Sequence, residues 1–279
     1  MLEISSVKLN SGTKMPALGF GTWNLHGDEA ERSVRAALNS GYRLIDTAKI
    51  YGNEQEVGQA IRDSQVSRQE IFVTTKLWTS DHGYESAHQA FDDSLGRLGL
   101  EYVDLYLIHW PGRDTQARLD SWRALDEIQH SGRAKAIGVS NFTPEHLAEL
   151  AKHSQTTPAV SQIEFHPFIH HRQISTLEYC KKHDIAVEAY SPLSMGRKID
   201  DPLISAVAKR VKRTNAQVML RWAIQHETIP IPKSAHPERI KENLQVFDFK
   251  LSDEEMDALD GLSGGNGKSA LPFWVKLIK

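Results

Sequence analysis

Four side chains in the first half of the sequence have chemistry suited to protonating a carbonyl oxygen: Asp46, Tyr51, Lys76 and His109. An unperturbed tyrosine has a pKa of about 10, which is high for a proton donor at neutral pH. A buried ammonium such as Lys76 would favour the phenolate and lower that pKa, and Asp46 would keep the ammonium charged. A neutral His109 ring could polarise the carbonyl through its N–H. This set of residues contains a proton donor but no nucleophile that could attack the carbonyl carbon.

Each of these four residues also has an ordinary structural interpretation. Asp46 could cap a loop, and Lys76 could be its salt-bridge partner. His109 follows an apolar run and could be a hydrogen-bonded core histidine, while Tyr51 alone would be assigned to packing. The chemical interpretation therefore depends on all four meeting at one place in the fold.

A second group of residues suggests that the missing partner is a hydride donor. The segment IPKSAHPERIKEN (231–243) runs from an apolar run into a helix start and clusters Lys233, Ser234 and Arg239. Two cations, a hydroxyl and helix N–H groups suit a phosphate, although a solvated, capped helix face is an equal alternative. A flat ring could stack on Tyr190. A carboxamide could bind the polar side chains of Ser140, Asn141 and Gln162. These are the parts of a nicotinamide dinucleotide site.

The elements that must position these side chains are short apolar runs that alternate with helical patterns. Near-continuous apolar runs are typical of strands buried on both faces of a parallel sheet. They predict a (β/α)8 TIM barrel with the site at the carboxyl ends of its strands. An open doubly wound sheet is the alternative, but the GFGT turn lacks the third glycine of a dinucleotide fingerprint. The eight runs span residues 15–22, 42–47, 71–77, 103–109, 134–140, 159–164, 185–190 and 228–232.

Local signals place several helix starts. Thr143-Pro144-Glu145 combines an N-cap residue, a proline at the first helical position and an acidic first turn. Ser252 with Glu255 forms a capping box. We expect helices to begin at both places.

Composition limits the class of protein. The 279 residues are 40% hydrophobic and 25% charged, with a net charge of -3, and predict one domain over residues 1–279. Lys+Arg number 33 against 36 Asp+Glu, so no basic footprint for nucleic acid is present. The single Cys180 excludes an internal disulfide framework and a cysteine-rich zinc site. A polar N-terminal segment and the absence of an 18-residue apolar stretch predict a soluble, cytoplasmic protein without a membrane partner.

Several segments, taken in order, resemble the aldo-keto reductase superfamily. GYRLIDTAKIYGNEQEVG (41–58) is similar to its first signature, GVSNF (138–142) to its second, and IPKS with Arg239 to its third. TTKLW (74–78) and LIHWP (107–111) resemble the segments that carry its lysine and histidine. The resemblance covers nearly the whole chain, so it is far more specific than any single motif.

The resemblance implies a barrel whose bottom is closed by an N-terminal hairpin, here residues 3–14. It implies that Tyr51 donates the proton, that Lys76 and Asp46 tune it and that His109 orients the carbonyl. An aromatic substrate wall would contain Trp23, Trp78 and Trp110 beside Tyr51 and His109. The cofactor would be NADPH/NADP+, favoured by cations near a 2′-phosphate. Implied cofactor contacts are Gly21, Thr22, Trp23, Asp46, Ser140, Asn141, Gln162, Tyr190, Ser191, Leu193, Lys233, Ser234, Arg239, Glu242 and Asn243.

Two departures bear on specificity. The loop SPLSMGRK (191–198) is short where some members fold a long loop over the cofactor, so we expect easier cofactor exchange. The tail (263–279) is also short, although Phe273 and Trp274 could cover part of the pocket. The pattern most resembles bacterial and fungal members that reduce small aldehydes, methylglyoxal or keto sugars such as 2,5-diketo-gluconate. A monomer is the default expectation.

Three other classes remain open from sequence. A Schiff-base lyase could use Lys76 as its nucleophile, but it leaves residues 231–243 unexplained. A metal-dependent hydrolase would need ligands, and His166, His170 and His171 lack matched carboxylates, so we predict no metal site. A non-catalytic, cofactor-sensing barrel subunit would keep the same residues. His226, near a helix end, suits the helix dipole without any catalytic role.

Overall fold

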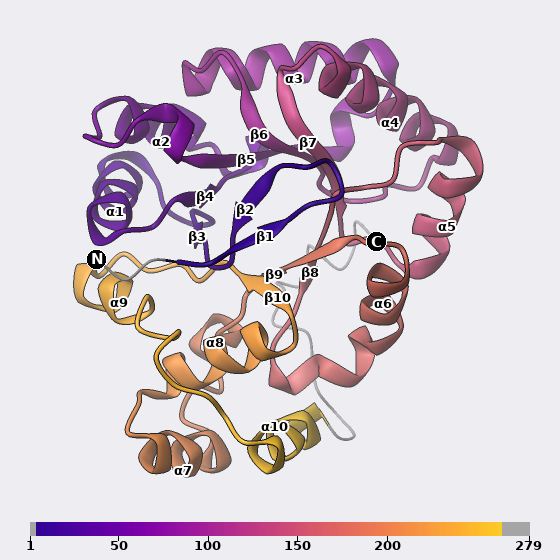
Figure 1. Cartoon of the computed structure of the whole chain (residues 1–279). Coiled ribbons are helices and arrows are strands. Elements are labelled where there is room, and N and C mark those ends of the chain that lie inside the picture. Colours follow the sequence, from indigo (N-terminus) through magenta and orange to yellow (C-terminus); the bar gives the residue numbers. More distant parts are fainter. Residues whose placement is uncertain (1–3, 264–279) are drawn as a thin grey trace.

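The computed structural model describes residues 4–263, and the predicted contribution of Phe273 and Trp274 lies outside these residues. Eight parallel strands run in chain order around a barrel, with helices outside them (Figure 1). The strands are β3 (Phe20–Gly21), β4 (Leu44–Asp46), β5 (Phe72–Leu77), β6 (Val103–Ile108), β7 (Ala134–Ser140), β8 (Val160–Glu164), β9 (Ala186–Tyr190) and β10 (Thr228–Pro230). The predicted (β/α)8 TIM barrel is thereby confirmed.

The first and last strands meet at a seam of glycine backbone. The Gly19 N–H donates to the Pro230 carbonyl at 3.0 Å, and the Gly21 N–H donates to the Pro232 carbonyl at 3.1 Å. A Cβ on Gly21 would lie 2.9 Å from the Ile231 carbonyl oxygen, so a side chain there would force the strands apart. The glycines therefore allow the close approach that joins β3 to β10.

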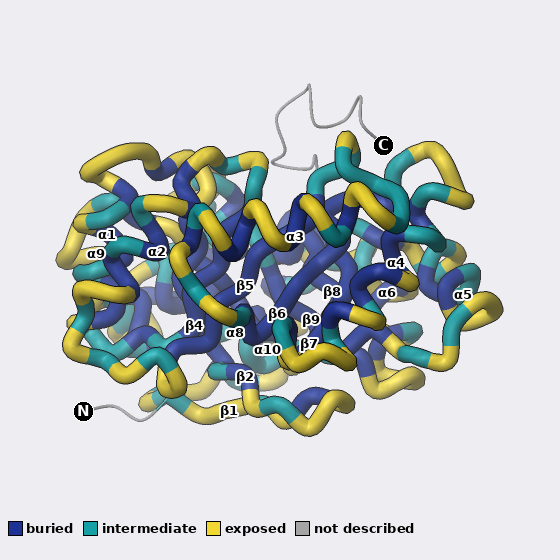
Figure 2. The backbone as a smooth tube through the Cα atoms, turned by 90° about the horizontal axis from the view of Figure 1, so that it is seen from above, coloured by how far each residue is buried: buried dark blue, intermediate teal, exposed yellow. Residues whose placement is uncertain are grey.

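Helices cover the outside of the barrel, and their buried faces pack on the strands (Figure 2). Those that connect successive strands are α1 (Gly27–Ser40), α2 (Glu54–Arg62), α3 (Tyr84–Leu98), α4 (Thr115–His130), α5 (Pro144–His153), α6 (His170–Lys182) and α8 (Asn215–Gln225). α7 (Pro202–Val211) precedes α8, whereas α9 (Pro237–Glu242) and α10 (Asp253–Asp260) follow β10. Short 3₁₀ turns comprise Lys49–Tyr51, Arg68–Glu70, Thr79–Asp81, Pro167–Ile169, Ser194–Gly196 and Gly261–Ser263.

The predicted helix starts are confirmed. The Thr143 hydroxyl accepts from the His146 N–H at the start of α5, with Pro144 as the first helical residue. The Ser252 hydroxyl accepts from the Glu255 N–H at the start of α10, and the Glu255 carboxylate accepts in return from the Ser252 N–H. These caps satisfy N–H groups that have no partner inside the helix.

A small hairpin closes the end of the barrel away from the site. β1 (Ser6–Lys8) pairs antiparallel with β2 (Lys14–Pro16) and crosses the barrel axis in Figure 1. The boundary differs from the sequence prediction, because residues 15–16 belong to this hairpin and not to the first barrel strand. Met15 instead packs into the barrel interior with the first residues of the strands, among them Leu44, Phe72 and Ile229.

Candidate active site

Strand ends bring the four predicted catalytic side chains together. Asp46 ends β4, Lys76 lies near the end of β5, His109 follows β6 directly, and Tyr51 ends the 3₁₀ turn after β4. Asp46 and Lys76 are almost completely buried, at 1% and 0% exposed. Because all barrel strands point the same way, these residues share the carboxyl end of the barrel.

Lys76 is held by oxygen atoms on three sides. Its Nζ donates to Asp46 Oδ1 at 2.6 Å and to the Thr47 carbonyl at 2.8 Å, and it lies 3.5 Å from the Tyr51 hydroxyl. Burial alone would lower the pKa of Lys76, but the Asp46 carboxylate and the Tyr51 hydroxyl outweigh it and raise that pKa. The ammonium is thus kept charged beside the phenol.

The Tyr51 phenol differs from the sequence prediction in the direction of its pKa change. Burial raises the pKa of Tyr51 to about 12, and the Lys76 charge lowers it only in part. Desolvation of the phenolate therefore exceeds the effect of the ammonium in this structure. The hydroxyl remains protonated at neutral pH, which is the state a proton donor needs.

His109 completes the group as a neutral ring. Burial, together with the Lys76 charge, holds the pKa of His109 well below its usual range. Its ring packs edge-on against Tyr51 at 5.7 Å and Trp78 at 5.1 Å between centroids. These contacts fix its orientation, and a neutral imidazole can donate an N–H to a carbonyl, as the sequence predicts.

Behind this group lies a buried carboxyl that the sequence analysis did not single out. The Gln162 side-chain N–H₂ donates to Asp46 Oδ2 at 2.8 Å and to Glu188 Oε2 at 2.6 Å. Glu188 lies in β9 and is fully buried, and burial with the Asp46 charge raises its pKa to about 8. Since both donors of the Gln162 amide are engaged, its carbonyl oxygen is left to accept from a ligand.

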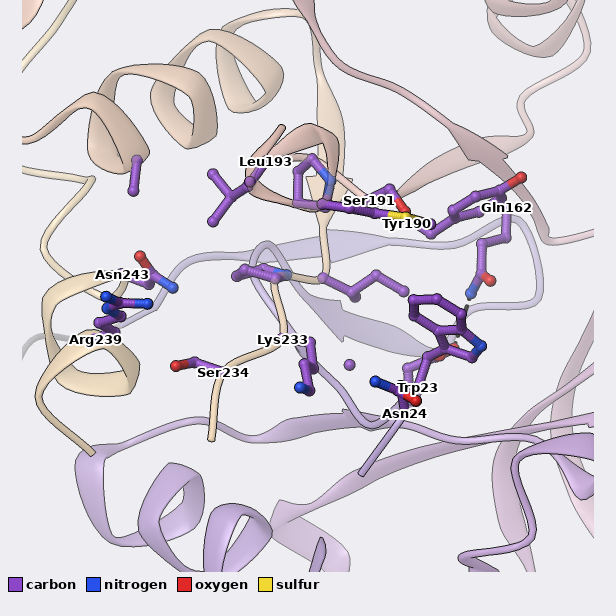
Figure 3. Close-up of a pocket in the computed structure, with 18 of the residues that line it drawn as sticks. Trp23, Asn24, Gln162, Tyr190, Ser191, Leu193, Lys233, Ser234, Arg239 and Asn243 are labelled. Atoms are coloured by element: carbon purple, nitrogen blue, oxygen red, sulfur yellow. Dashed lines mark hydrogen bonds between the residues drawn. The ribbon is translucent and has the colours of Figure 1, made fainter. Parts of the chain in front are cut away.

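The site opens into a cavity of about 940 Å³ that Tyr51 lines. Figure 3 shows this cavity between Trp23 and Arg239. Asn141 and Tyr190 lie in its wall and are linked, since the Tyr190 hydroxyl donates to Asn141 Oδ1 at 2.7 Å. Predicted residues that line it are Gly21, Trp23, Asp46, Tyr51, Trp78, His109, Trp110, Asn141, Gln162, Tyr190, Ser191, Leu193, Lys233, Ser234, Arg239, Glu242 and Asn243.

Two predicted cofactor contacts do not line the cavity. Thr22 is fully buried, and its hydroxyl donates to the Asp46 carbonyl at 2.9 Å. Ser140 is also buried, and its hydroxyl accepts from the Asn141 amide at 2.9 Å. Thr22 and Ser140 therefore position Asp46 and Asn141, which line the cavity, and do not line it themselves.

Two cationic side chains line the part of the cavity away from the catalytic group. Lys233 and Arg239 are exposed, and neither forms a salt bridge within residues 4–263. In Figure 3 Arg239 lies at the same end as Asn243, away from Gln162 and Tyr190, and Ser234 and Lys233 lie between that end and Trp23. Two exposed cations near a hydroxyl suit a phosphate, and the nearby polar groups suit a nucleotide.

The structure also adds lining residues that the sequence analysis missed. Thr214, Asn215 and Ala216 at the start of α8 line the cavity, and the Thr214 hydroxyl donates to Glu242 at 2.7 Å. The capping-box pattern of Thr214 with Gln217 could have flagged this helix start, but not its place beside the cavity. Other missed lining residues are Asn24, Ile50, Pro192, Met195, Gly196, Ile199, Asp200, Ile231 and Pro232.

The loop after β9 has strained backbone where it lines the cavity. Ser191 and Met195, which line the cavity, and the buried Ser194 between them have φ between 50° and 52°, a region that residues other than glycine seldom occupy. Such strain typically concentrates at ligand-binding loops. The loop is short, as expected, and it forms one wall of the nucleotide-sized cavity.

A barrel with a buried Lys–Asp pair, a tyrosine and a neutral histidine at its mouth defines a class of barrel oxidoreductase. The family model "Aldo/keto reductase family" matches residues 17–263, and the chain belongs to this family. The matched region contains the residues of the catalytic group and of the cavity described above.

Individual relatives agree with this family assignment. A glyoxal reductase from Bacillus subtilis is 47% identical and covers 92% of each chain. A morphine 6-dehydrogenase from Pseudomonas putida is 48% identical over 93% of this chain and 91% of its own. The crystal structure of a Bombyx mori aldo-keto reductase in complex with NADP has a TM-score of 0.89 and 34% identity, covering 98% of this chain and 96% of its own.

Proposed function

We propose that this protein reduces aldehydes and ketones to alcohols with NADPH. The observation that carries the proposal is Lys76, buried and bound by Asp46, with the Tyr51 hydroxyl 3.5 Å away at the base of the cavity. This arrangement places a protonated phenol beside a fixed positive charge. It suits a reaction in which an oxygen gains negative charge and then a proton.

In this mechanism each residue has a separate task. A bound nicotinamide would supply the hydride that reduces the carbonyl carbon. Tyr51 donates its proton to the carbonyl oxygen, and Lys76 stabilises the phenolate that forms. His109, neutral at the cavity wall, orients the carbonyl through an N–H donor. Asp46 holds the Lys76 ammonium in place beside the Tyr51 hydroxyl.

The cavity supports a nicotinamide dinucleotide as the cofactor. Gln162 presents a carbonyl oxygen and Asn141 lies beside it, so a carboxamide would find polar partners near the catalytic group. Tyr190 offers a ring face for stacking. Arg239 lies at the other end, with Lys233 between it and Trp23, and a 2′-phosphate bound by these cations would make NADPH the preferred form.

The substrate class follows from the opening beside Tyr51. Trp23, Trp78 and Trp110 surround it with aromatic surface, and Trp23 is 36% exposed. This wall accepts small apolar or planar carbonyl compounds. The related glyoxal reductase supports small dicarbonyls such as methylglyoxal as first candidates, followed by aromatic aldehydes and keto sugar acids.

The test is loss of NADPH absorbance with methylglyoxal, an aromatic aldehyde and a keto sugar acid, each repeated with NADH. We expect turnover with at least one of them and a preference for NADPH. Tryptophan quenching by NADPH without turnover across a broad carbonyl panel would favour a cofactor-sensing subunit. Borohydride trapping of a substrate on Lys76, without cofactor binding, would instead establish the Schiff-base alternative.

A further inference from the structure

A cluster of three potential ligands lies on the outside of the barrel, away from the cavity. His170 is the first residue of α6, His226 follows the last turn of α8, and Asp260 ends α10. One donor atom from each lies within 4.8 Å of the other two. None of the three lines the catalytic cavity. The fold therefore brings three helix ends, distant in sequence, to one point.

The distances suit a single ion shared by the three side chains. Nε2 of His226 lies 2.9 Å from Asp260 Oδ1, and Nδ1 of His170 lies 3.6 Å from the same oxygen. Zinc binds histidine nitrogen and carboxylate oxygen at about 2.0–2.2 Å, which separates neighbouring ligand atoms of a tetrahedral ion by about 3.3 Å. The observed separations lie on either side of this value.

The surroundings orient the ligands as a metal site requires. The Trp222 indole N–H donates to Asp260 Oδ1 at 2.7 Å, and the Trp222 ring stacks on Phe165 at 4.7 Å between centroids. The two histidine rings lie 4.6 Å apart at an angle of 41°. A hydrogen bond to a ligating carboxylate and rigid packing behind it are the usual support for metal ligands.

The exposure of the three side chains also allows an ion to bind. The side chains of His170, His226 and Asp260 are 13%, 19% and 27% exposed, so water can complete the coordination shell.

We propose that His170, His226 and Asp260 form a binding site for one zinc-class divalent ion that ties α6, α8 and α10 together. Two histidines and one carboxylate are a ligand set that zinc takes with water in the fourth position. The ion would stabilise the outer helices and leave the chemistry at Tyr51 unchanged. A site of this kind is independent of the proposed carbonyl reduction, so the two can fail separately.

The test uses the full, untagged chain stripped with a chelator and titrated with Zn²⁺ alone by calorimetry. We expect one ion per chain and a Tm that rises with Zn²⁺, because binding to the folded state stabilises it. His170→Ala should weaken binding about tenfold or more. His170 lies 3.6 Å from Asp260, so its removal leaves the Trp222–Asp260 hydrogen bond in place.

Two further variants keep the test decisive. Asp260→Asn retains an oxygen that can accept from Trp222 but loses the carboxylate charge, and it should also lose most Zn²⁺ affinity. His130→Ala is the matched control, because His130 lies near Asp126 in the last turn of α4 and belongs to no group of three potential ligands in the described part of the chain. Its affinity and Tm shift should equal those of the wild type.

The opposing results are clear. No saturable Zn²⁺ binding by the wild type would leave Asp260 as a plain hydrogen-bond acceptor for Trp222 and His226 and would overturn the proposal. Equal binding by wild type and His170→Ala would place the ion elsewhere and overturn it as well. NADPH oxidation measured with and without chelator should be the same at 25 °C.

Discussion

The two ends of the cavity differ in the burial and pairing of their charged side chains. At the catalytic end the Lys76 and Asp46 side chains are 0% and 2% exposed and form a 2.6 Å ion pair, with Glu188 behind them. From the middle of the cavity to its nucleotide end, Lys233 and Arg239 are exposed and have no salt-bridge partner among residues 4–263. Charge at the first end is fixed within the fold, whereas charge at the second is available to a ligand.

This difference predicts which substitutions change chemistry and which change affinity. A buried, paired charge cannot be removed without leaving its partner desolvated, so its loss affects the whole site. An exposed cation interacts through solvent, and its loss weakens a ligand without disturbing the fold. The following changes test this division, from the largest expected effect to the smallest.

Tyr51→Phe should give the largest loss. Removal of the hydroxyl eliminates the proton donor, and general acid catalysis contributes about 10²–10⁴-fold to rate. The kcat for carbonyl reduction should fall by that order, while the Kd for NADPH, read from tryptophan quenching, should stay within about twofold. An unchanged kcat would exclude Tyr51 as the donor.

Lys76→Met should reduce both activity and stability. The change leaves the buried Asp46 carboxylate uncompensated, which typically destabilises a protein by about 3–5 kcal/mol. Urea unfolding measures the free energy. The double variant Asp46→Asn with Lys76→Met removes both charges and should recover part of that free energy without recovering kcat. Equal destabilisation of the single and double variants would argue against the ion pair as the cause.

Glu188→Gln should change how stability depends on pH. The pKa of Glu188 is raised from 4.5 to about 8, so the folded state holds its proton more tightly than the unfolded state. The wild type therefore loses stability as pH rises from the lower to the higher of these values, by up to about 1.4 kcal/mol for each pH unit. The variant lacks this loss. Its free energy of unfolding relative to wild type should increase from pH 5 to pH 9, and a constant difference would contradict the raised pKa.

Arg239→Ala should have the smallest and most selective effect. It should weaken NADPH by about tenfold and NADH much less, because an exposed cation beside a phosphate contributes roughly 1–1.5 kcal/mol. Fluorescence titration with both cofactors measures this. Arg32→Ala on α1 is the control, since Arg32 is 72% exposed and does not line the cavity. Equal weakening of both cofactors would exclude recognition of the 2′-phosphate.

Much of the fold was predictable because its signals are local. The buried strands carry continuous apolar runs, and the caps at Thr143 and Ser252 are set by residues three positions apart. The start of the barrel was harder to place. Met15 and Pro16 belong to the hairpin because Met15 fills the barrel interior, a contact that depends on distant strands.

The site was predictable where its residues end strands, and less so where contacts join separate elements. The group around Asp46, Tyr51, Lys76 and His109 was predicted from its chemistry, but the raised pKa of Tyr51 depends on a degree of burial that no motif encodes. Glu188 lies inside an ordinary apolar strand pattern. Its role becomes visible only through its hydrogen bond to Gln162.

The seam between β3 and β10 has a consequence for how the chain is made. The bonds from Gly19 and Gly21 reach Pro230 and Pro232, so the barrel cannot close until most of the chain has left the ribosome. Until then β3 presents an unpaired strand edge, which can pair with other chains. We therefore expect the nascent chain to be most prone to aggregation before β10 is made, because β10 then pairs with the open edge of β3.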